Sequence, residues 1–369
     1  MTEELRLGFG GPLHRVQRAA RVERARRLIP LLVAVTWAPL CLFALVGWAT
    51  SGIADSLIRD WSVHARLLVA MPVMILAERL LDQTARISIA RLFDEALVPP
   101  ASVPRVRAMV RAVARWCDSA WPESLLLVAA FAAGIAALAG WIPESGVLSG
   151  HETYRYDAVR LWYGLAALPI FQFIVWRSLF RFALWLRLLV GLARTPLALV
   201  ATHADRRGGI IFLRMPSVVY GALLLFATSA VLCASWATQV AMHGTPLATF
   251  RVPMLIFVVL GVVVVLAPLL MFTPQLAMLR VLGMRRYGGL MTDYARRFEE
   301  TPINAQALAQ MMNTYQRAVA VVSPTLFGKG DAIVLAVFAL LPALPLVLLQ
   351  GPTNQLLKRL AGLLLGGMP

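Results

Sequence analysis

Ionisable residues flank a short apolar core in residues 60–82, DWSVHARLLVAMPVMILAERLLD. The uncharged middle, residues 67–77, covers only about 16 Å as a helix, whereas the hydrocarbon core of a bilayer is about 30 Å thick. A helix that crosses a membrane here must therefore draw the neighbouring charges into or near the bilayer.

Four of these side chains, Asp60, His64, Glu78 and Asp82, fall within about 40° of one another on a regular helix. Charges in a bilayer are costly and usually face a bundle interior or a wet cavity. One interpretation is an ion or proton pathway, with His64 near the outer mouth and Glu78 near the inner mouth. The alternative is structural. Either the charges cap a short helix, or an arginine of a neighbouring helix, such as Arg160 or Arg177, pairs with Glu78 or Asp82.

A second polar group comes from the loop THADRRGG, residues 202–209. Arg206 and Arg207 could bind a phosphate or lipid headgroup, with His203 and Asp205 beside them. The alternative is a structural turn in which Asp205 caps a helix and the arginines lie at the headgroups. The lysine–serine pair and glycine spacing of a P-loop are absent.

Catalytic and metal-binding patterns are not found in the sequence. His64, His151 and His243 come from three separate loops and have no ligand spacing such as HxxxH. No serine-nucleophile, paired-carboxylate or dinucleotide motif is visible. We therefore predict no enzyme activity, no metal site and no cofactor.

Composition identifies the class of protein. Of 369 residues, 59% are hydrophobic and 15% charged, with a mean hydropathy of +0.73. This predicts an all-α polytopic transmembrane helix bundle with six or seven spans and sizeable cytoplasmic helices. The net charge of +16 comes almost wholly from arginines beside apolar runs, which excludes nucleic-acid binding and indicates topology. The arginine-, alanine- and leucine-rich composition is typical of a bacterial protein, so we expect the inner (plasma) membrane.

The predicted segments alternate between membrane and cytoplasm. They are a basic cytoplasmic segment (1–27), two spans (28–81), a cytoplasmic amphipathic segment (82–123), two spans (124–182), a cytoplasmic extension with the THADRRGG loop (183–217), two spans (218–271), a cytoplasmic helical segment (272–330), and a final segment with an amphipathic tail (331–369). The amino terminus and the three inner segments with their adjoining helix ends hold most of the lysines and arginines, which predicts a cytoplasmic amino terminus.

The final segment leaves two alternatives. If residues 331–349 span the membrane, Lys358 and Arg359 lie outside. A re-entrant hairpin around Pro342 and Pro345 would return them to the cytoplasm. The sequence does not decide between these topologies.

Two further segments carry expectations about packing. Arg107, Arg111 and Arg115 lie opposite an apolar stripe, which predicts an amphipathic helix on the membrane surface or on a partner helix. The stripe contains Val106, Met109, Val110, Val113 and Trp116. The third span, residues 124–141, is rich in alanine and glycine, so we expect it to pack closely and to be buried among other helices.

Several sequence blocks resemble a family of bacterial multi-pass inner-membrane proteins that have no assigned activity. The blocks are TWAPL (36–40), DWSVHARLLVAMP with AERL (60–80), THADRRGG with IIFL (202–213), YGGLMTDYARRF (287–298) and LPALPL (341–346). The chain departs from the pattern at Ala204, where the family often has proline, and at Glu299–Glu300, where it has Lys-Trp. The resemblance implies an integral membrane protein and no particular substrate.

Two functional hypotheses arise from these patterns. The first is a channel- or transporter-like protein that passes an ion or small solute, as a homo-oligomer, with Glu78, His64 and Asp82 on the lining face. The second is a non-transporting scaffold or sensor whose arginine-rich cytoplasmic helices bind a protein partner or anionic lipid. Membrane lipids are expected partners under both.

Overall fold

The computed structural model describes residues 25–51, 60–139, 157–300, 305–315 and 322–346, and every regular element within them is a helix. The principal helices are α2 (Ala25–Ser51), α4 (Trp61–His64), α5 (Met71–Asp94), α6 (Val103–Asp118), α7 (Ala120–Leu138), α8 (Asp157–Trp162), α9 (Leu168–Ala193), α10 (Met215–His243), α11 (Arg251–Leu266), α12 (Thr273–Glu300), α13 (Ala305–Thr314) and α14 (Lys329–Leu340). The predicted all-α polytopic bundle is confirmed.

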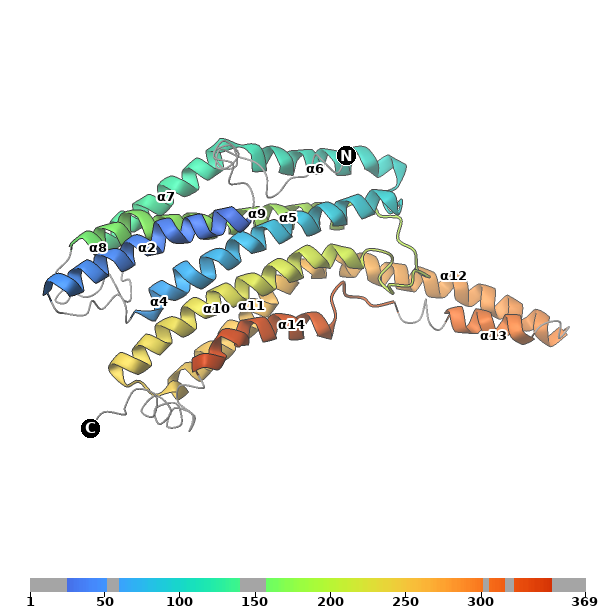
Figure 1. The fold of residues 1–369 in the computed structure, drawn as a ribbon. Helices are drawn as coiled ribbons and strands as arrows, with labels where there is room; N and C mark the ends of the chain where they lie inside the picture. The colour runs from blue at the N-terminus through green and yellow to red at the C-terminus, as the bar shows by residue number, and fades with distance from the viewer. Residues whose placement is uncertain (1–24, 52–59, 140–156, 301–304, 316–321, 347–369) are drawn as a thin grey trace.

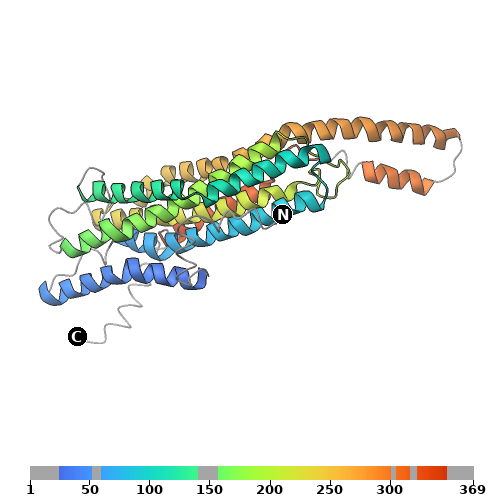
Figure 2. The ribbon, with the colours of Figure 1, turned by 90° about the horizontal axis from the view of Figure 1, so that it is seen from above.

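The long helices run side by side and alternate in direction (Figure 1; Figure 2). We call the end that carries α6 and the 194–214 loop the basic end, and the opposite end, where α4 begins and α10 ends, the far end. Six described helical runs are long and apolar enough to cross a membrane: Arg27–Val46, Ala120–Leu138, Ala158–Ala193, Ile211–Ala241, Leu247–Arg297 and Lys329–Leu346. The more polar helix formed by α4 and α5 lies among them.

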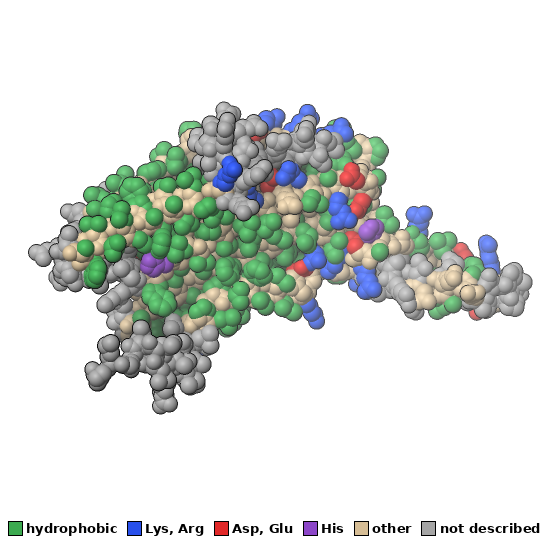
Figure 3. Space-filling view, viewed as in Figure 1, with side chains coloured by type: hydrophobic (Ala, Val, Ile, Leu, Met, Phe, Trp, Pro, Cys, Tyr) green, Lys and Arg blue, Asp and Glu red, His purple; other side chains and the backbone are tan. Residues whose placement is uncertain are grey.

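The centre of the bundle is α5, which packs along both α9 and α10. Leu81, Ala85 and Trp185 have no exposed surface there. The peripheral helices instead expose large apolar side chains, such as Val128 at 66% and Val252 at 63%. This distribution fits a bundle whose outer surface faces lipid rather than water (Figure 3).

Helix α7 is peripheral, so the expectation that it is buried among other helices was wrong. Only one face packs, and there the backbones approach closely. A β-carbon added to Gly134 would lie 2.4 Å from the carbonyl oxygen of Gly164. The alanine- and glycine-rich sequence thus indicated close packing, but it did not show that the opposite face is open.

Two of the long helices contain a π-helical turn directly before a proline. One turn, Ala65–Ala70, precedes Pro72, and the other, Tyr163–Ala167, precedes Pro169. A proline ring lacks an N–H and clashes with the carbonyl four residues earlier, and the wider turn accommodates both effects. An extra residue in a turn rotates the helix before the turn by roughly 100° relative to the helix after it.

Beyond the basic end, α12 projects out of the bundle and α13 packs back against it (Figure 1). We call the described residues 281–300 and 305–315 the arm. The sequence predicted a helical segment over residues 272–330, and the structure has two helices within it, Thr273–Glu300 and Ala305–Thr314. Tyr287 and Tyr294 are half-buried, and the neighbouring Gly288 lies against the Tyr315 hydroxyl, so this face is a helix contact.

The amphipathic helix α6 packs on α9 of its own chain. Val106, Val110 and Val113 are buried, and Arg107 and Arg111 are exposed. Of the two predicted positions for this helix, on the membrane surface or on a partner helix, the structure shows the second. Trp116, which the pattern placed on the apolar stripe, is 45% exposed because it lies at the edge of the contact.

The last described run, Lys329–Leu346, extends from the basic end to the far end and is long enough to cross a membrane. Pro342 lies in a 3₁₀ turn that continues the helix rather than reversing it. The spanning alternative thus fits the described part of this segment. The predicted amino-terminal segment, except residues 25–27, and the tail after Leu346 lie outside the described residues.

Candidate functional site

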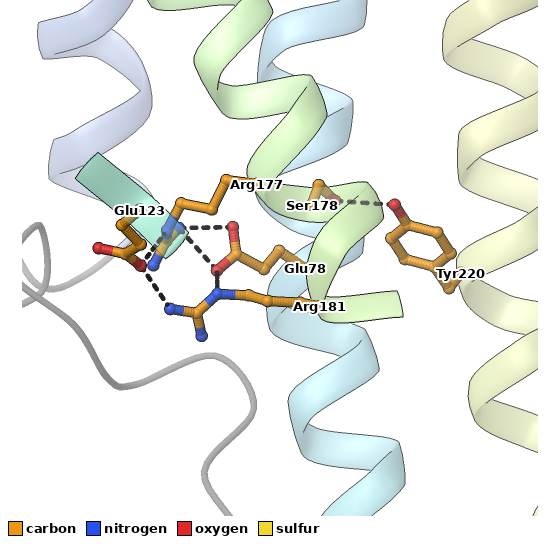
Figure 4. Close-up of polar contacts among 6 residues, drawn as sticks. All are labelled: Glu78, Glu123, Arg177, Ser178, Arg181 and Tyr220. Carbon is orange, nitrogen blue, oxygen red and sulfur yellow. Dashed lines mark hydrogen bonds and ion pairs between the residues drawn. The ribbon is translucent and has the colours of Figure 1, made fainter. Parts of the chain in front are cut away.

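Four charged residues meet inside the bundle and form a closed network, which we call the tetrad (Figure 4). The Arg177 guanidinium lies 2.7 Å from the Glu78 carboxylate and 2.8 Å from that of Glu123. The Arg181 guanidinium lies 3.1 Å from Glu78 and 3.0 Å from Glu123. No more than 9% of any of these four side chains is exposed.

The tetrad joins three helices and balances its charges. Glu78 comes from α5, Glu123 from the first turn of α7, and both arginines from α9. Two guanidiniums face two carboxylates, so the group is neutral although each member is buried. Because breaking such a group leaves a buried charge uncompensated, the tetrad fixes the three helices relative to one another.

Sequence reasoning anticipated half of this group. The pairing of Arg177 with Glu78 was one of the structural alternatives. Arg181, in contrast, fell at the end of the spans predicted over residues 124–182 without an expected partner, and Glu123 fell at the end of the predicted cytoplasmic segment 82–123. The usable signal was the four-residue spacing of Arg177 and Arg181, which places both on one face of α9.

The other predicted pathway residues have partners of their own. Asp60 accepts hydrogen bonds from the backbone N–H of Ser62, at 3.0 Å, and from its hydroxyl, at 2.7 Å, and so caps the start of α4. Asp82 is fully buried and lies 2.9 Å from the Arg86 guanidinium.

The common face predicted for these residues assumed a regular helix. The π turn at Ala65–Ala70 rotates Asp60 and His64 away from the line of Glu78 and Asp82. The single face predicted for the four residues is therefore divided by the π turn into two pairs, Asp60 with His64 and Glu78 with Asp82. The structure instead assigns them to a cap, a groove, the tetrad and a local ion pair.

His64 borders an apolar groove of about 610 Å³ near the far end of the bundle. The indole Nε1–H of Trp37 donates to its Nδ1 at 3.0 Å. Indole nitrogen can only donate, so Nδ1 is the acceptor and the neutral ring carries its hydrogen on Nε2. The groove is lined by Trp61, His64, Ala65, Leu68, Val69, Phe226, Ala230, Cys233, Ala234, Ala237, Pro342, Pro345 and Leu346.

The THADRRGG loop is organised around its own carboxylate. Asp205 accepts hydrogen bonds from the backbone N–H groups of Arg207 at 2.8 Å, Gly209 at 3.0 Å and Ile211 at 3.2 Å. His203 Nδ1 lies 2.9 Å from the same carboxylate. Burial alone would raise the pKa of Asp205, but these hydrogen bonds hold it below its ordinary value.

This geometry matches the structural alternative for the loop. The N–H groups that could hold a phosphate already hold Asp205, and Ile211 begins a 3₁₀ turn that leads into α10. Gly208 and Gly209 have φ of +69° and +95°, which only glycine adopts easily. Of the two arginines, Arg206 is exposed and Arg207 donates from Nε to the carbonyl of Thr325 at 3.0 Å.

Two more contacts complete a clasp between this loop and the segment before α14. The backbone N–H of Ser323 donates to the carbonyl of Arg206 at 2.9 Å. Arg214, next to the start of α10, forms an ion pair with Asp331 in the first turn of α14. The loop residues therefore tie the basic ends of two helices together.

Metal-binding geometry is not seen in the described residues, where no three histidine, cysteine, aspartate or glutamate side chains gather. His151 and the side chain of His243 lie outside what the structure describes. No protein-family model matches the chain, and neither a curated protein nor a solved structure matches it. The family resemblance of the sequence blocks therefore stays a prediction.

Proposed function

We propose that this chain is a membrane-anchored scaffold whose arm, residues 281–300 and 305–315, binds a cytoplasmic protein partner. In this proposal the chain lies in a bacterial inner membrane with its basic end in the cytoplasm, because arginine-rich ends stay on that side. Most of the exposed arginines described in the structure lie on α6, the 194–214 loop and α12.

One observation carries the proposal: the helical run Leu247–Arg297 is too long for a membrane. It holds 51 residues. Such a helix is about 75 Å long, whereas a bilayer with its headgroups is roughly 45 Å thick. Roughly 30 Å of ordered helix therefore stands clear of the lipid, which points to a protein partner rather than to headgroups.

The surface of the arm offers both charge and apolar area. Arg285, Arg286, Arg296 and Arg297 are exposed along α12. Leu282 and Leu290 are 50% and 51% exposed on the same helix. Exposed leucines among arginines are typical of a surface that receives an acidic partner with apolar side chains.

The transport hypothesis has less support from the geometry. Glu78 is held by two arginines, and Asp82 pairs with Arg86. A residue that carries a proton or ion must exchange partners during each cycle, and a closed ion-pair network opposes that exchange. The buried acids of α5 therefore favour a structural role.

Site-specific photo-cross-linking in native membranes tests the proposal. A photoreactive amino acid replaces Leu290 on the arm and, as the matched control, Val259, which is 55% exposed on α11 within the apolar belt. We expect a discrete protein adduct from position 290 and none from position 259. Adding Arg285→Glu and Arg286→Glu should weaken the adduct from position 290.

Three outcomes would count against the scaffold. The first is no protein adduct from position 290, or the same adducts as from position 259. The second is an adduct with only a second copy of this chain, which would replace the cytoplasmic partner with a homo-oligomer. The third is ion flux through wild-type protein in proteoliposomes that is lost with His64→Ala, which would favour transport.

A further inference from the structure

We propose that the groove beside His64 holds one acyl chain of a phospholipid from the leaflet at the far end of the bundle. The groove lies between α4 with its π turn, α10, and residues 341–346, which follow α14. Its volume of about 610 Å³ falls within the range of small-molecule sites, roughly 300–1,000 Å³.

The walls of the groove suit a hydrocarbon chain. Small residues on α10, among them Ala230, Ala234 and Ala237, leave the space, and Phe226 and Leu68 border it. Apart from the edges of Trp61 and His64, every lining side chain is apolar. A polar ligand would lose its hydration here without gaining partners, whereas an acyl chain loses nothing.

The length of the groove matches one leaflet. Its α10 wall extends from Phe226 to Ala237, which is about 16 Å of helix. This is close to half of the roughly 30 Å hydrocarbon thickness of a bilayer. A single chain descending from the far-end surface would therefore fill it.

The polar end of the groove is placed for an ester. His64 accepts from Trp37 at Nδ1, so its Nε2–H is left to donate to another group. Trp61, 47% exposed beside it, lies at the start of α4, where interfacial tryptophans meet headgroups. We infer that an ester carbonyl oxygen of the phospholipid accepts the Nε2–H of His64.

The surroundings favour lipid over the other occupants. Leu68 and Val69, on the rim, are 39% and 37% exposed, and Leu344, in the segment after α14, is 56% exposed. The groove is thus continuous with the apolar surface that faces the bilayer. The competing occupant is the chain's own tail, residues 347–369, which comes directly after Leu346 at the groove edge.

Native mass spectrometry of the purified full-length protein tests the site. Ala234→Trp fills the groove, and Ala132→Trp, at an exposed alanine on α7, adds the same side chain to the outer surface. We expect wild type and Ala132→Trp to retain one phospholipid and Ala234→Trp to lose it. His64→Leu, which removes the hydrogen bond to the ester, should lower the affinity for the phospholipid roughly fivefold.

A second measurement does not depend on the variants folding. A phospholipid with a diazirine in its acyl chain is photolysed in membranes with wild-type protein, which is then digested and mapped. Adducts on residues 226–237 at a yield above that on α11 support the proposal. Equal yields on both helices would overturn it, as would equal lipid retention by the two tryptophan variants. A photo-cross-link from position 234 to the tail would also overturn it.

This inference and the scaffold proposal can fail independently. The groove experiments measure lipid at the far end, while the cross-linking at Leu290 measures a protein at the basic end. A lipid in the groove with no partner on the arm would leave a lipid-binding membrane protein whose inner face has another role.

Discussion

Arg177 and Glu78 lie 2.7 Å apart in the interior of the bundle, on neighbouring helices and 99 residues apart in sequence. Their side chains are 7% and 9% exposed, so neither charge is solvated by water. The pair is neutralised within the tetrad, where Arg181 and Glu123 supply the second pair. Glu78, the acid that first suggested an ion pathway, is therefore part of a brace across α5, α7 and α9.

The brace predicts a large loss of stability on removing one acid. Glu78→Gln leaves two guanidiniums facing one carboxylate, and breaking a buried pair in this way costs about 3–5 kcal/mol. We expect a marked fall in the unfolding temperature of the purified protein in detergent. Glu78→Gln combined with Arg181→Met restores the charge balance and should recover part of the loss.

The matched control is Glu95→Gln, which removes an acid near the end of the same helix. Glu95 pairs with Arg91 at 3.1 Å, and their side chains are 33% and 53% exposed. Such exposed pairs contribute roughly 0.3–0.5 kcal/mol. If Glu78→Gln proved as mild as Glu95→Gln, the tetrad would not be a brace, and Glu78 would again be a candidate for exchange with water.

The sequence predicted the tetrad only in part, and the reason is physical. Glu78 and Arg177 stand within apolar stretches, where a lone charge is so costly that a partner can be expected. Glu123 stands at the boundary of its span, where water could have solvated its charge without a partner. Its pairing with the two arginines of α9 depends on how α7 packs against α9, which no local sequence pattern encodes.

The π turn before Pro72 limited the prediction in another way. Projection at about 100° per residue placed His64 and Glu78 on one face, and a single wide turn separated them. The length and apolar character of the spans, in contrast, depend on solvent preference and were predictable. The protruding arm was predicted as helix, but the sequence did not show that it continues α11 through the 3₁₀ turn at Ala267–Phe272.

The contact between Gly134 and Gly164 predicts opposite effects for two similar substitutions. In Gly134→Ala the new β-carbon would lie 2.4 Å from the Gly164 carbonyl oxygen, so α7 must shift. Overpacking of this kind costs about 1–3 kcal/mol. In Gly289→Ala, on α12, no atom lies within 4 Å of the new carbon. Helix propensity alone should then stabilise the arm by up to about 1 kcal/mol.

Thermal unfolding of the purified variants checks this pair. Because the residue change is identical, the difference isolates the close approach of the two backbones. Equal unfolding temperatures for both variants would contradict the packing of α7 against the turn that holds Gly164.

The THADRRGG loop predicts a response to pH. Because the folded pKa of Asp205 lies below its ordinary value, its hydrogen bonds stabilise the loop above the unfolded pKa. That stability is lost as the pH falls through the folded value. We expect amide hydrogen exchange at Gly209 and Ile211 to quicken in acid, after correction for intrinsic rates. Asp205→Asn should quicken it at neutral pH, while Asn in place of the exposed Asp293 should leave it unchanged.

A different result would change the assignment of this loop. If Asp205→Asn left both amides protected at neutral pH, an uncharged side chain would be sufficient to hold the loop. The wild type should then show no faster exchange in acid. If inorganic phosphate alone protected these amides in Asp205→Asn, the loop would be an anion site that its own carboxylate normally fills.

The ion pair between Arg214 and Asp331 predicts an order of effects within the clasp. Asp331 also accepts the backbone N–H of Gly328 at 2.8 Å and lies in the first turn of α14, where a negative charge is favoured. Asp331→Asn therefore weakens three interactions, whereas Arg214→Gln weakens one. Hydrogen exchange in the first turn of α14 should quicken more with Asp331→Asn than with Arg214→Gln. Lys329→Gln, at an exposed position, should have little effect on this exchange. If Asp331→Asn quickened exchange no more than Arg214→Gln, the predicted order would be wrong, and the ion pair alone would hold α14 to α10.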